Sequence, residues 1–320
     1  MNPLRRHLLA LAPLLALGEP AHALMAGSVP DSPQARVDAN RPSSPWTSAV
    51  AVLTKAGVFS GVVVAPRHVL TAAHVAASAQ PADVMVQLNH EAVPLQLAAS
   101  AIASFPGASF PYDDLSLITL ASPVPDGVQI LPIRRELPPM HQELTLVGYG
   151  GSGPGDQGAS VPRAAGLKRS GRNVLDAVQA SIDDSGRRSL FFLYDFDGPS
   201  GDGPLGGPSL GNAIETGVAE GDSGGPAYAE IDGHRWLVGI NTVTLTQGAG
   251  VPVDFRFGTI GGGMLLCDPR FLAWLETRTG GTLAPPPGMP WPAWVLGAGA
   301  AGLVGFLGLG WRWTRRTPNA

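Results

Sequence analysis

Short apolar runs between turn residues dominate the middle of this 320-residue chain. A β-branched apolar run covers residues 62–70, and residues 115–120 have the alternation of a strand with one buried face. Residues 190–194 predict a further strand, since they read Leu-Phe-Phe-Leu-Tyr. A helix is predicted over residues 268–275, where Asp268 is a candidate N-cap, Pro269 occupies the first helical position and apolar residues recur at helical spacing.

A charged and then apolar segment at the start of the chain predicts a signal peptide over residues 1–23. Arg5 and Arg6 supply the charge, residues 8–17 form a short apolar core, and residues 21–23 read Ala-His-Ala, a small-residue cleavage site. The remainder of the chain is therefore expected to be exported.

A second apolar stretch, residues 293–311, carries no charge. As a helix it would span ~28 Å, close to the thickness of a bilayer core. A Pro- and Gly-rich linker over residues 279–292 precedes it, and three arginines lie in residues 312–320. Positive residues stay in the cytoplasm, so the pattern predicts one transmembrane helix with residues 24–278 on the other side and residues 312–320 in the cytoplasm. Tryptophans flank the span on both sides: Trp291, Trp294, Trp311 and Trp313.

Charge and cysteine content narrow the function classes. Only 14% of the residues are charged and the net charge is −4, and no basic segment with interleaved aromatic residues argues for nucleic-acid binding. Cys267 is the single cysteine, so no internal disulfide can form, and we expect it to be a small buried apolar residue.

The most informative motif is Gly-Asp-Ser-Gly-Gly-Pro at residues 221–226. It places Ser223 between glycines that allow close approach of a substrate, but a serine is a weak nucleophile without a base. The chain supplies His74 at the end of Thr-Ala-Ala-His and Asp114 at the start of Asp-Leu-Ser-Leu. Asp113 is the competing acid, and Asp114 is preferred because it directly precedes Leu-Ser-Leu.

These three segments, in the order His, Asp, Ser, resemble the chymotrypsin- and trypsin-like serine proteases. The resemblance implies that Ser223 attacks the scissile carbonyl, that His74 accepts its proton and that Asp114 orients the histidine ring. It also implies an oxyanion hole made by the backbone N–H groups of Gly221 and Ser223.

Further likeness lies at residues 147–150, 237–242 and 268–275, so that the resemblance covers residues 24–278. It implies an all-β fold of two six-stranded antiparallel β-barrels, at about residues 24–140 and 146–266, with a short C-terminal helix. Many members carry cysteines where this chain has Ser60 and Val75, and both are absent together.

Cleavage after Ala23 would expose Leu24, and the resemblance implies that the freed amino group pairs with Asp222 and shapes the oxyanion hole. We therefore expect cleavage by signal peptidase to activate the enzyme with no separate zymogen step.

Specificity is expected to depend on Gly217, Thr242 and Thr244, by resemblance to the floor and wall of the family's primary pocket. An aspartate at the place of Gly217 would select Arg and Lys. Its absence predicts a preference for small or medium uncharged side chains, unless Glu215 or Glu220 reaches the pocket.

Residues 151–216 are rich in Gly, Pro, Ser and Asp, and an irregular insertion is expected there. Asp195, Asp197 and Asp202 lie close together in it, as calcium ligands do, although acidic loop residues are usually solvated. No other metal or cofactor is expected.

The tail resembles bacterial sorting signals of the PEP-CTERM type, with Trp291 where that signal has Glu. Both a permanent anchor and one removed by a membrane sorting protease stay open. The sequence thus favours a serine endopeptidase acting on protein or peptide substrates, at the periplasmic or cell-surface face of a bacterial membrane or released after tail processing. The alternatives are an inactive surface adhesin or scaffold on the same fold, and an esterase with the same triad.

Overall fold

The computed structural model describes residues 24–76, 78–246 and 252–289. The predicted signal peptide (1–23), the end of the linker, the predicted span (293–311) and the tail (312–320) lie outside these residues. No helix within the described residues is long and apolar enough to cross a membrane.

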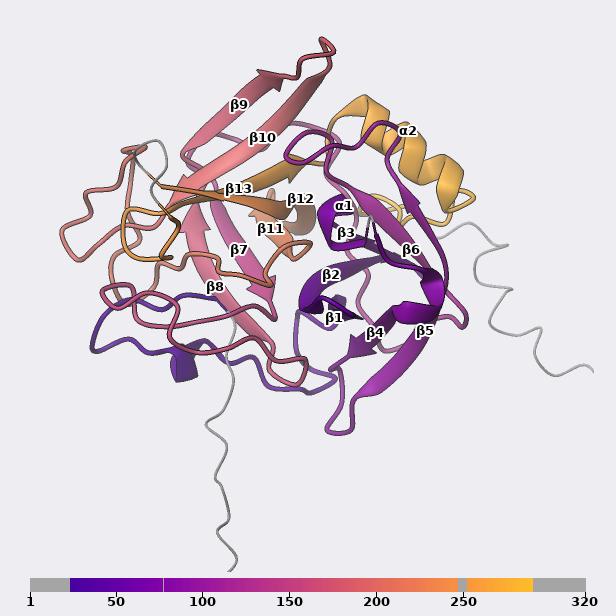
Figure 1. Cartoon of the computed structure of the whole chain (residues 1–320), viewed down its shortest axis with the longest axis horizontal. Coiled ribbons are helices and arrows are strands. Elements are labelled where there is room, and N and C mark those ends of the chain that lie inside the picture. Colours follow the sequence, from indigo (N-terminus) through magenta and orange to yellow (C-terminus); the bar gives the residue numbers. More distant parts are fainter. Residues whose placement is uncertain (1–23, 77, 247–251, 290–320) are drawn as a thin grey trace, which may run out of the picture.

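Six antiparallel strands close into a barrel in the first half of the chain, in the order β1-β2-β3-β6-β5-β4 (Figure 1). Their bounds are β1 Ala49–Thr54, β2 Gly57–Ala65, β3 His68–Thr71, β4 Met85–Leu88, β5 Leu95–Ser104 and β6 Ser116–Leu120. Short helices lie at η1 Pro33–Arg36, α1 Ala73–Ala76 and η2 Pro81–Asp83. A buried cluster that includes Val52, Val69 and Ile118 fills the barrel.

The apolar run of residues 62–70 folds as a hairpin and not as a single strand. Strand β2 ends at Ala65, Pro66 and Arg67 form a turn, and β3 returns from His68 against β2. A proline has no N–H to donate to a sheet ladder, so it favours a turn at this position. The hairpin places Thr71, and therefore the segment that follows it, at one end of the barrel.

The second half of the chain forms a seven-stranded antiparallel sheet in the order β8-β7-β11-β12-β13-β10-β9. The strands are β7 Glu143–Gly148, β8 Arg169–Val174, β9 Ala177–Ile182, β10 Arg188–Asp195, β11 Pro226–Ile231, β12 His234–Leu245 and β13 Ile260–Leu265. The expected second six-stranded barrel is therefore wrong in strand number and closure, because pairing among the described strands does not join β8 to β9.

Three of the seven strands lie within residues 151–216, the segment expected to be irregular. Residues 169–195 form β8, β9 and β10, and only the parts on either side, 151–168 and 196–216, lack regular strands. Strand β10 contains the predicted run 190–194 and pairs with β13 on one side and with β9 on the other. Its Phe192 and Tyr194 are buried, and this apolar face is what holds the hairpin on the sheet.

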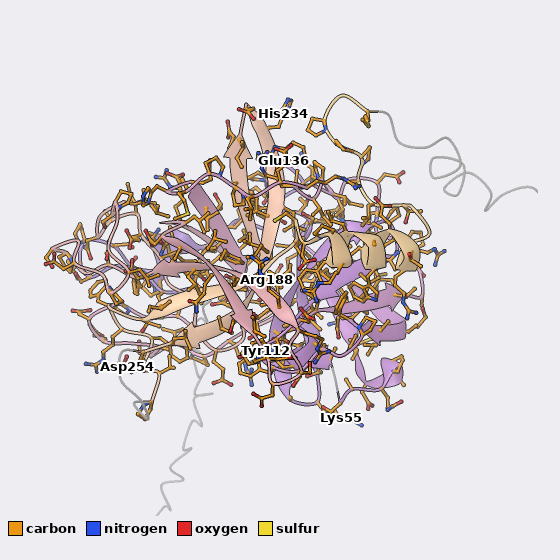
Figure 2. All side chains as sticks on the ribbon, turned by 90° about the horizontal axis from the view of Figure 1, so that it is seen from above. Lys55, Tyr112, Glu136, Arg188, His234 and Asp254 are labelled. Atoms are coloured by element: carbon orange, nitrogen blue, oxygen red, sulfur yellow. The ribbon has the colours of Figure 1, made fainter. Side chains whose placement is uncertain are left out.

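A shared apolar core joins the two β units, which lie side by side in Figure 1. The predicted helix is confirmed as α2 Pro269–Arg278, and the Asp268 carboxylate caps it by accepting from the Arg270 N–H at 2.9 Å. Phe271 and Trp274 of α2 pack edge-on against Phe105 from the first unit. Exposed polar side chains, such as Lys55, His234 and Asp254, lie on the outer rim (Figure 2).

Candidate active site

His74 and Asp114 meet at one end of the closed barrel. His74 lies in α1, directly after β3, and Asp114 lies just before β6, the neighbour of β3 in the barrel. The His74 Nδ1 is 2.6 Å from Asp114 Oδ2, and the His74 backbone N–H donates to Asp114 Oδ1 at 2.8 Å. Both oxygens of a fully buried carboxylate therefore hold the histidine, whose side chain stays 28% exposed.

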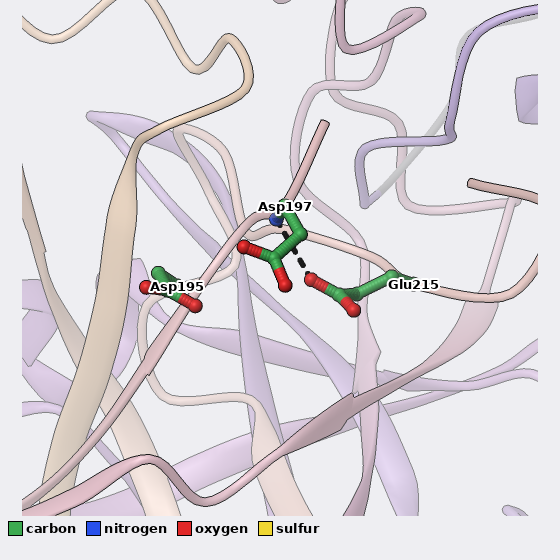
Figure 3. A group of neighbouring side chains, drawn as sticks. All are labelled: Asp195, Asp197 and Glu215. Carbon is green, nitrogen blue, oxygen red and sulfur yellow. Dashed lines mark hydrogen bonds between the residues drawn. The ribbon is translucent and has the colours of Figure 1, made fainter. Parts of the chain in front are cut away.

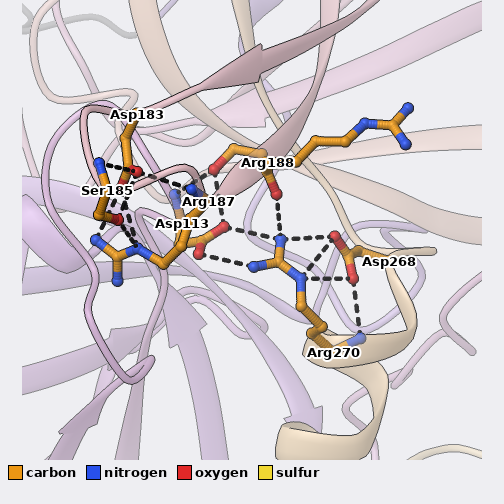
Figure 4. Close-up of polar contacts among 8 residues, drawn as sticks. Asp113, Asp183, Ser185, Arg187, Arg188, Asp268 and Arg270 are labelled. Atoms are coloured by element: carbon orange, nitrogen blue, oxygen red, sulfur yellow. Dashed lines mark hydrogen bonds and ion pairs between the residues drawn. The ribbon is translucent and has the colours of Figure 1, made fainter.

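The adjacent acid, Asp113, is bound elsewhere. Arg270 of α2 donates to both of its carboxylate oxygens, at 3.0 and 3.1 Å, and the Ser189 hydroxyl donates to Oδ1 at 2.8 Å. Figure 4 shows this group, in which Arg270 is shared between Asp113 and Asp268. Asp113 is thus engaged by structural contacts. Of the two aspartates, Asp114 is the one that binds His74.

Ser223 lies in the turn before β11, held by backbone hydrogen bonds on both sides. Its carbonyl accepts from the Ser60 N–H at 3.1 Å, and the following Gly224 N–H donates to the Asn241 carbonyl at 2.8 Å. Ser223 and His74 line the same pocket of about 540 Å³, although no hydrogen bond joins their side chains among the described contacts. The pocket brings residues from the two β units together.

The backbone around Ser223 leaves two donors free. Among the hydrogen bonds of the described residues, none has the Gly221 or the Ser223 N–H as donor, and both residues line the pocket. Gly221 has φ +96°, a left-handed conformation that strains any residue with a side chain. Among the described hydrogen bonds, the turn therefore leaves two N–H groups unused beside the pocket, where the resemblance implies an oxyanion hole.

Asp222, between these two residues, is fully buried. Its carboxylate accepts from the N–H groups of Gly150 and Ala219, both at 2.9 Å. A Cβ on Gly150 would collide with Asp222, so the missing side chain is what permits this approach. Burial raises the pKa of Asp222 to about 7, against the lowering effect of these hydrogen bonds.

Leu24 reaches this carboxylate from the start of the described chain. Its backbone N–H donates to Asp222, and its side chain is completely buried. The Ser152 hydroxyl donates to the Leu24 carbonyl, and the Met25 N–H donates to the Gly217 carbonyl at 2.9 Å. The segment from Leu24 onward therefore packs against the second β unit, and the backbone nitrogen of Leu24 binds Asp222.

Of the residues expected to determine specificity, the structure places only some in the pocket that contains Ser223. Thr242 and Thr244 line the pocket, whereas Gly217 does not; its carbonyl is bound to Met25 and its Cα faces the Phe196 ring. Of the two glutamates, Glu220 lines the pocket, where it pairs with Arg163 at 3.3 Å, and Glu215 lies outside it.

Sequence reasoning missed most of the apolar lining of this pocket: Phe59, Phe110, Val218, Ala219, Val243 and Phe255. Val218 and Ala219 could have been inferred from their nearness to Ser223. The three phenylalanines carry no local signal, since they come from separate loops and strands that only the tertiary fold unites. The Thr242 hydroxyl is buried in this lining without a hydrogen-bond partner in the described part of the chain.

Comparison with known proteins agrees with this architecture. Residues 35–168 match the family model of Trypsin, which includes His74, Asp114 and the whole closed barrel and ends before Ser223. No curated protein matches the chain. Together with the closed six-stranded barrel and the second sheet, this match over residues 35–168 supports an all-β, trypsin-like serine protease fold.

Proposed function

We propose that this protein is a serine endopeptidase that cleaves exported proteins or peptides through an acyl-enzyme. The observation that carries the proposal is the pairing of His74 with both oxygens of buried Asp114, in a pocket that also contains Ser223. The backbone N–H groups of Gly221 and Ser223, which donate to no described residue, supply the remaining requirement for acyl transfer.

The chemistry follows from these positions. The protonated His74 Nδ1 donates a hydrogen bond to Asp114, which leaves His74 Nε2 free to accept the Ser223 hydroxyl proton as the oxygen attacks the substrate carbonyl. The same proton then passes from His74 to the departing amine, and water hydrolyses the ester left on Ser223. The Gly221 and Ser223 N–H groups stabilise the oxyanion, each by ~3 kcal/mol.

Maturation and location complete the proposal. Cleavage after Ala23 would convert the Leu24 N–H at Asp222 into an ammonium group, which supports activation by signal peptidase alone. The apolar stretch 293–311 would then anchor the enzyme at the outer face of a bacterial membrane, permanently or until a sorting protease removes it.

The apolar lining of the pocket favours substrates with uncharged side chains. Glu220 is the carboxylate at its edge, and it is 73% exposed and paired with Arg163, so it offers little attraction to a buried Arg or Lys. A cleavage profile on a peptide library should show small or medium apolar residues before the scissile bond. Dominant cleavage after Arg or Lys would contradict this specificity.

Labelling with a fluorophosphonate tests the activity itself. The secreted protein should react once per chain, and Ser223→Ala and His74→Ala should abolish the reaction. Ser100→Ala and His234→Ala, at exposed positions outside the pocket, serve as matched controls and should label normally. Absence of labelling in correctly processed protein would instead support the inactive scaffold.

An esterase with the same triad would also label. Comparison of peptide substrates with the corresponding esters separates the two enzymes, since an endopeptidase must turn over both, whereas an esterase leaves the peptides intact.

A further inference from the structure

We propose that Asp195, Asp197 and Glu215 form a calcium-binding site in the second β unit, away from the pocket that contains Ser223. Their carboxylate oxygens lie within 4.8 Å of one another, and all three residues are buried, with exposed fractions of 3%, 5% and 1%. Asp195 ends β10 and the other two lie in the irregular segment that follows. Figure 3 shows Asp197 between its two partners.

Asp197 presents an unused oxygen to this cluster. Its Oδ1 is buried and accepts no hydrogen bond from any described residue. An orphaned carboxylate oxygen inside a protein is costly, and a bound cation is a common way of satisfying one. This atom distinguishes the cluster from a set of acidic groups that are already paired with donors.

No basic side chain neutralises the three carboxylates among the described ion pairs. Arg36 comes near, but its guanidinium pairs with Asp31 and donates to the backbone carbonyls of Ile214 and Glu215. Within residues 24–76, 78–246 and 252–289, the site therefore gathers negative charge that no basic side chain balances.

The surrounding backbone fixes the ligand oxygens in place. The Leu205 N–H donates to Asp195 Oδ2 at 2.5 Å, and the Asp197 N–H donates to Glu215 Oε1 at 2.7 Å. Gly203 lies so close to Asp195 and Asp197 that a Cβ there would strike both carboxylates. Asp202, a ligand candidate from the sequence, is exposed, and Glu215 joins the cluster in its place.

Calcium fits this donor set better than magnesium or a transition metal. It accepts six to eight oxygen ligands in irregular geometry, which carboxylates and loop carbonyls can supply, whereas Mg²⁺ demands near-octahedral geometry and keeps several waters. The absence of His and Cys from the cluster argues against zinc.

A cation at this site would stabilise the segment that contacts residues 24 and 25. Glu215 leads directly into Thr216 and Gly217, whose hydroxyl and carbonyl bind Met25 at 2.5 and 2.9 Å. A cation that joins the end of β10 to Glu215 would therefore hold this segment, and the pocket wall at Val218 beyond it, in one conformation.

Thermal unfolding of the purified mature protein tests the proposal, in the Ser223→Ala background so that autolysis plays no part. After treatment with a chelator, Ca²⁺ at about 100 times its Kd should raise Tm by roughly 5–10 °C, and titration calorimetry should give one site per chain. Asp197→Asn and Glu215→Gln should abolish both effects. Asp184→Asn, an exposed acid in the β9–β10 turn, is the matched control and should retain them.

Two outcomes would overturn the proposal. If Ca²⁺ neither binds nor changes Tm, and Asp197→Asn raises Tm by relieving repulsion, the carboxylates share protons and the calcium site does not exist. An equal response to Mg²⁺ at the same concentration would overturn the assignment to calcium. Because the background lacks Ser223, neither outcome depends on whether the protein is a protease.

Discussion

Two adjacent aspartates have opposite environments in this protein. Asp113 has φ +49°, a left-handed conformation that turns the chain so that its carboxylate points to Arg270 while that of Asp114 points to His74. The sequence favoured Asp114 from its place before Leu-Ser-Leu. It gave no sign that Arg270, 157 positions away, would engage Asp113.

The two acids should respond differently to the same change. Asp114→Asn should lower kcat by about 10⁴-fold with a small change in KM, because the amide stabilises the wrong histidine tautomer. Asp113→Asn should keep kcat within a few-fold and instead cost about 1–2 kcal/mol of stability through the weakened pair with Arg270. Steady-state kinetics and urea unfolding measure the two effects. Equal loss of kcat in both variants would contradict the assignment.

At the scale of elements, α2 links the C-terminal part of the fold to the first β unit. Phe271 is fully buried in the core shared by the two units and contacts Phe105 edge-on, with ring centroids 4.9 Å apart. The Asp-Pro start and the spacing of apolar residues were enough to predict this helix. Its packing partner could not be predicted, since nothing local in the sequence identifies Phe105.

Truncation of this contact should destabilise the whole domain. Phe271→Ala should lower the free energy of unfolding by about 3–5 kcal/mol, the usual cost of a cavity of this size. Thr277→Ala, on the exposed face of the same helix, should change it by less than about 0.5 kcal/mol. Urea unfolding in the Ser223→Ala background gives both values. A small effect of Phe271→Ala would mean that α2 can detach without loss of the core.

Strand β9 and the acidic cluster of Asp195, Asp197 and Glu215 could not be predicted from local sequence patterns. Among the described strands, residues 177–182 pair only with β10, and they are largely solvent-accessible, so they lack the apolar run that reveals a buried strand. Glu215 lies 18 positions from Asp197, and only the course of the loop between them brings the two carboxylates together. Local pattern predicts elements and motifs, whereas loop paths follow from tertiary packing.

For the molecule as a whole, the segment at Leu24 and the turn that carries Ser223 are connected through Asp222. Leu24 lies 198 positions before Asp222, yet its N–H reaches that carboxylate, and the intervening residues build the closed barrel and four strands of the second sheet. The motif Gly-Asp-Ser-Gly-Gly-Pro predicted the nucleophile, and only the resemblance to a known family suggested the partner of Asp222. Cleavage after Ala23 would thus change the charge next to Asp222, which lies between the two residues of the proposed oxyanion hole.

The pH dependence of stability should reveal this coupling. In unprocessed protein the folded-state pKa of Asp222 is raised to about 7, so its neutral form is favoured and the fold loses stability as pH rises from about 4 to about 7. In processed protein the Leu24 ammonium favours the carboxylate, which lowers that pKa and removes the loss. The processed form should therefore gain stability over the unprocessed form by on the order of 1.4 kcal/mol per pH unit across this range. Thermal unfolding of both forms, each carrying Ser223→Ala, measures the difference, and Asp222→Asn should make it independent of pH. A difference that stays constant from pH 4 to pH 7 in the Asp222 protein would show that the Leu24 amino group does not pair with this carboxylate.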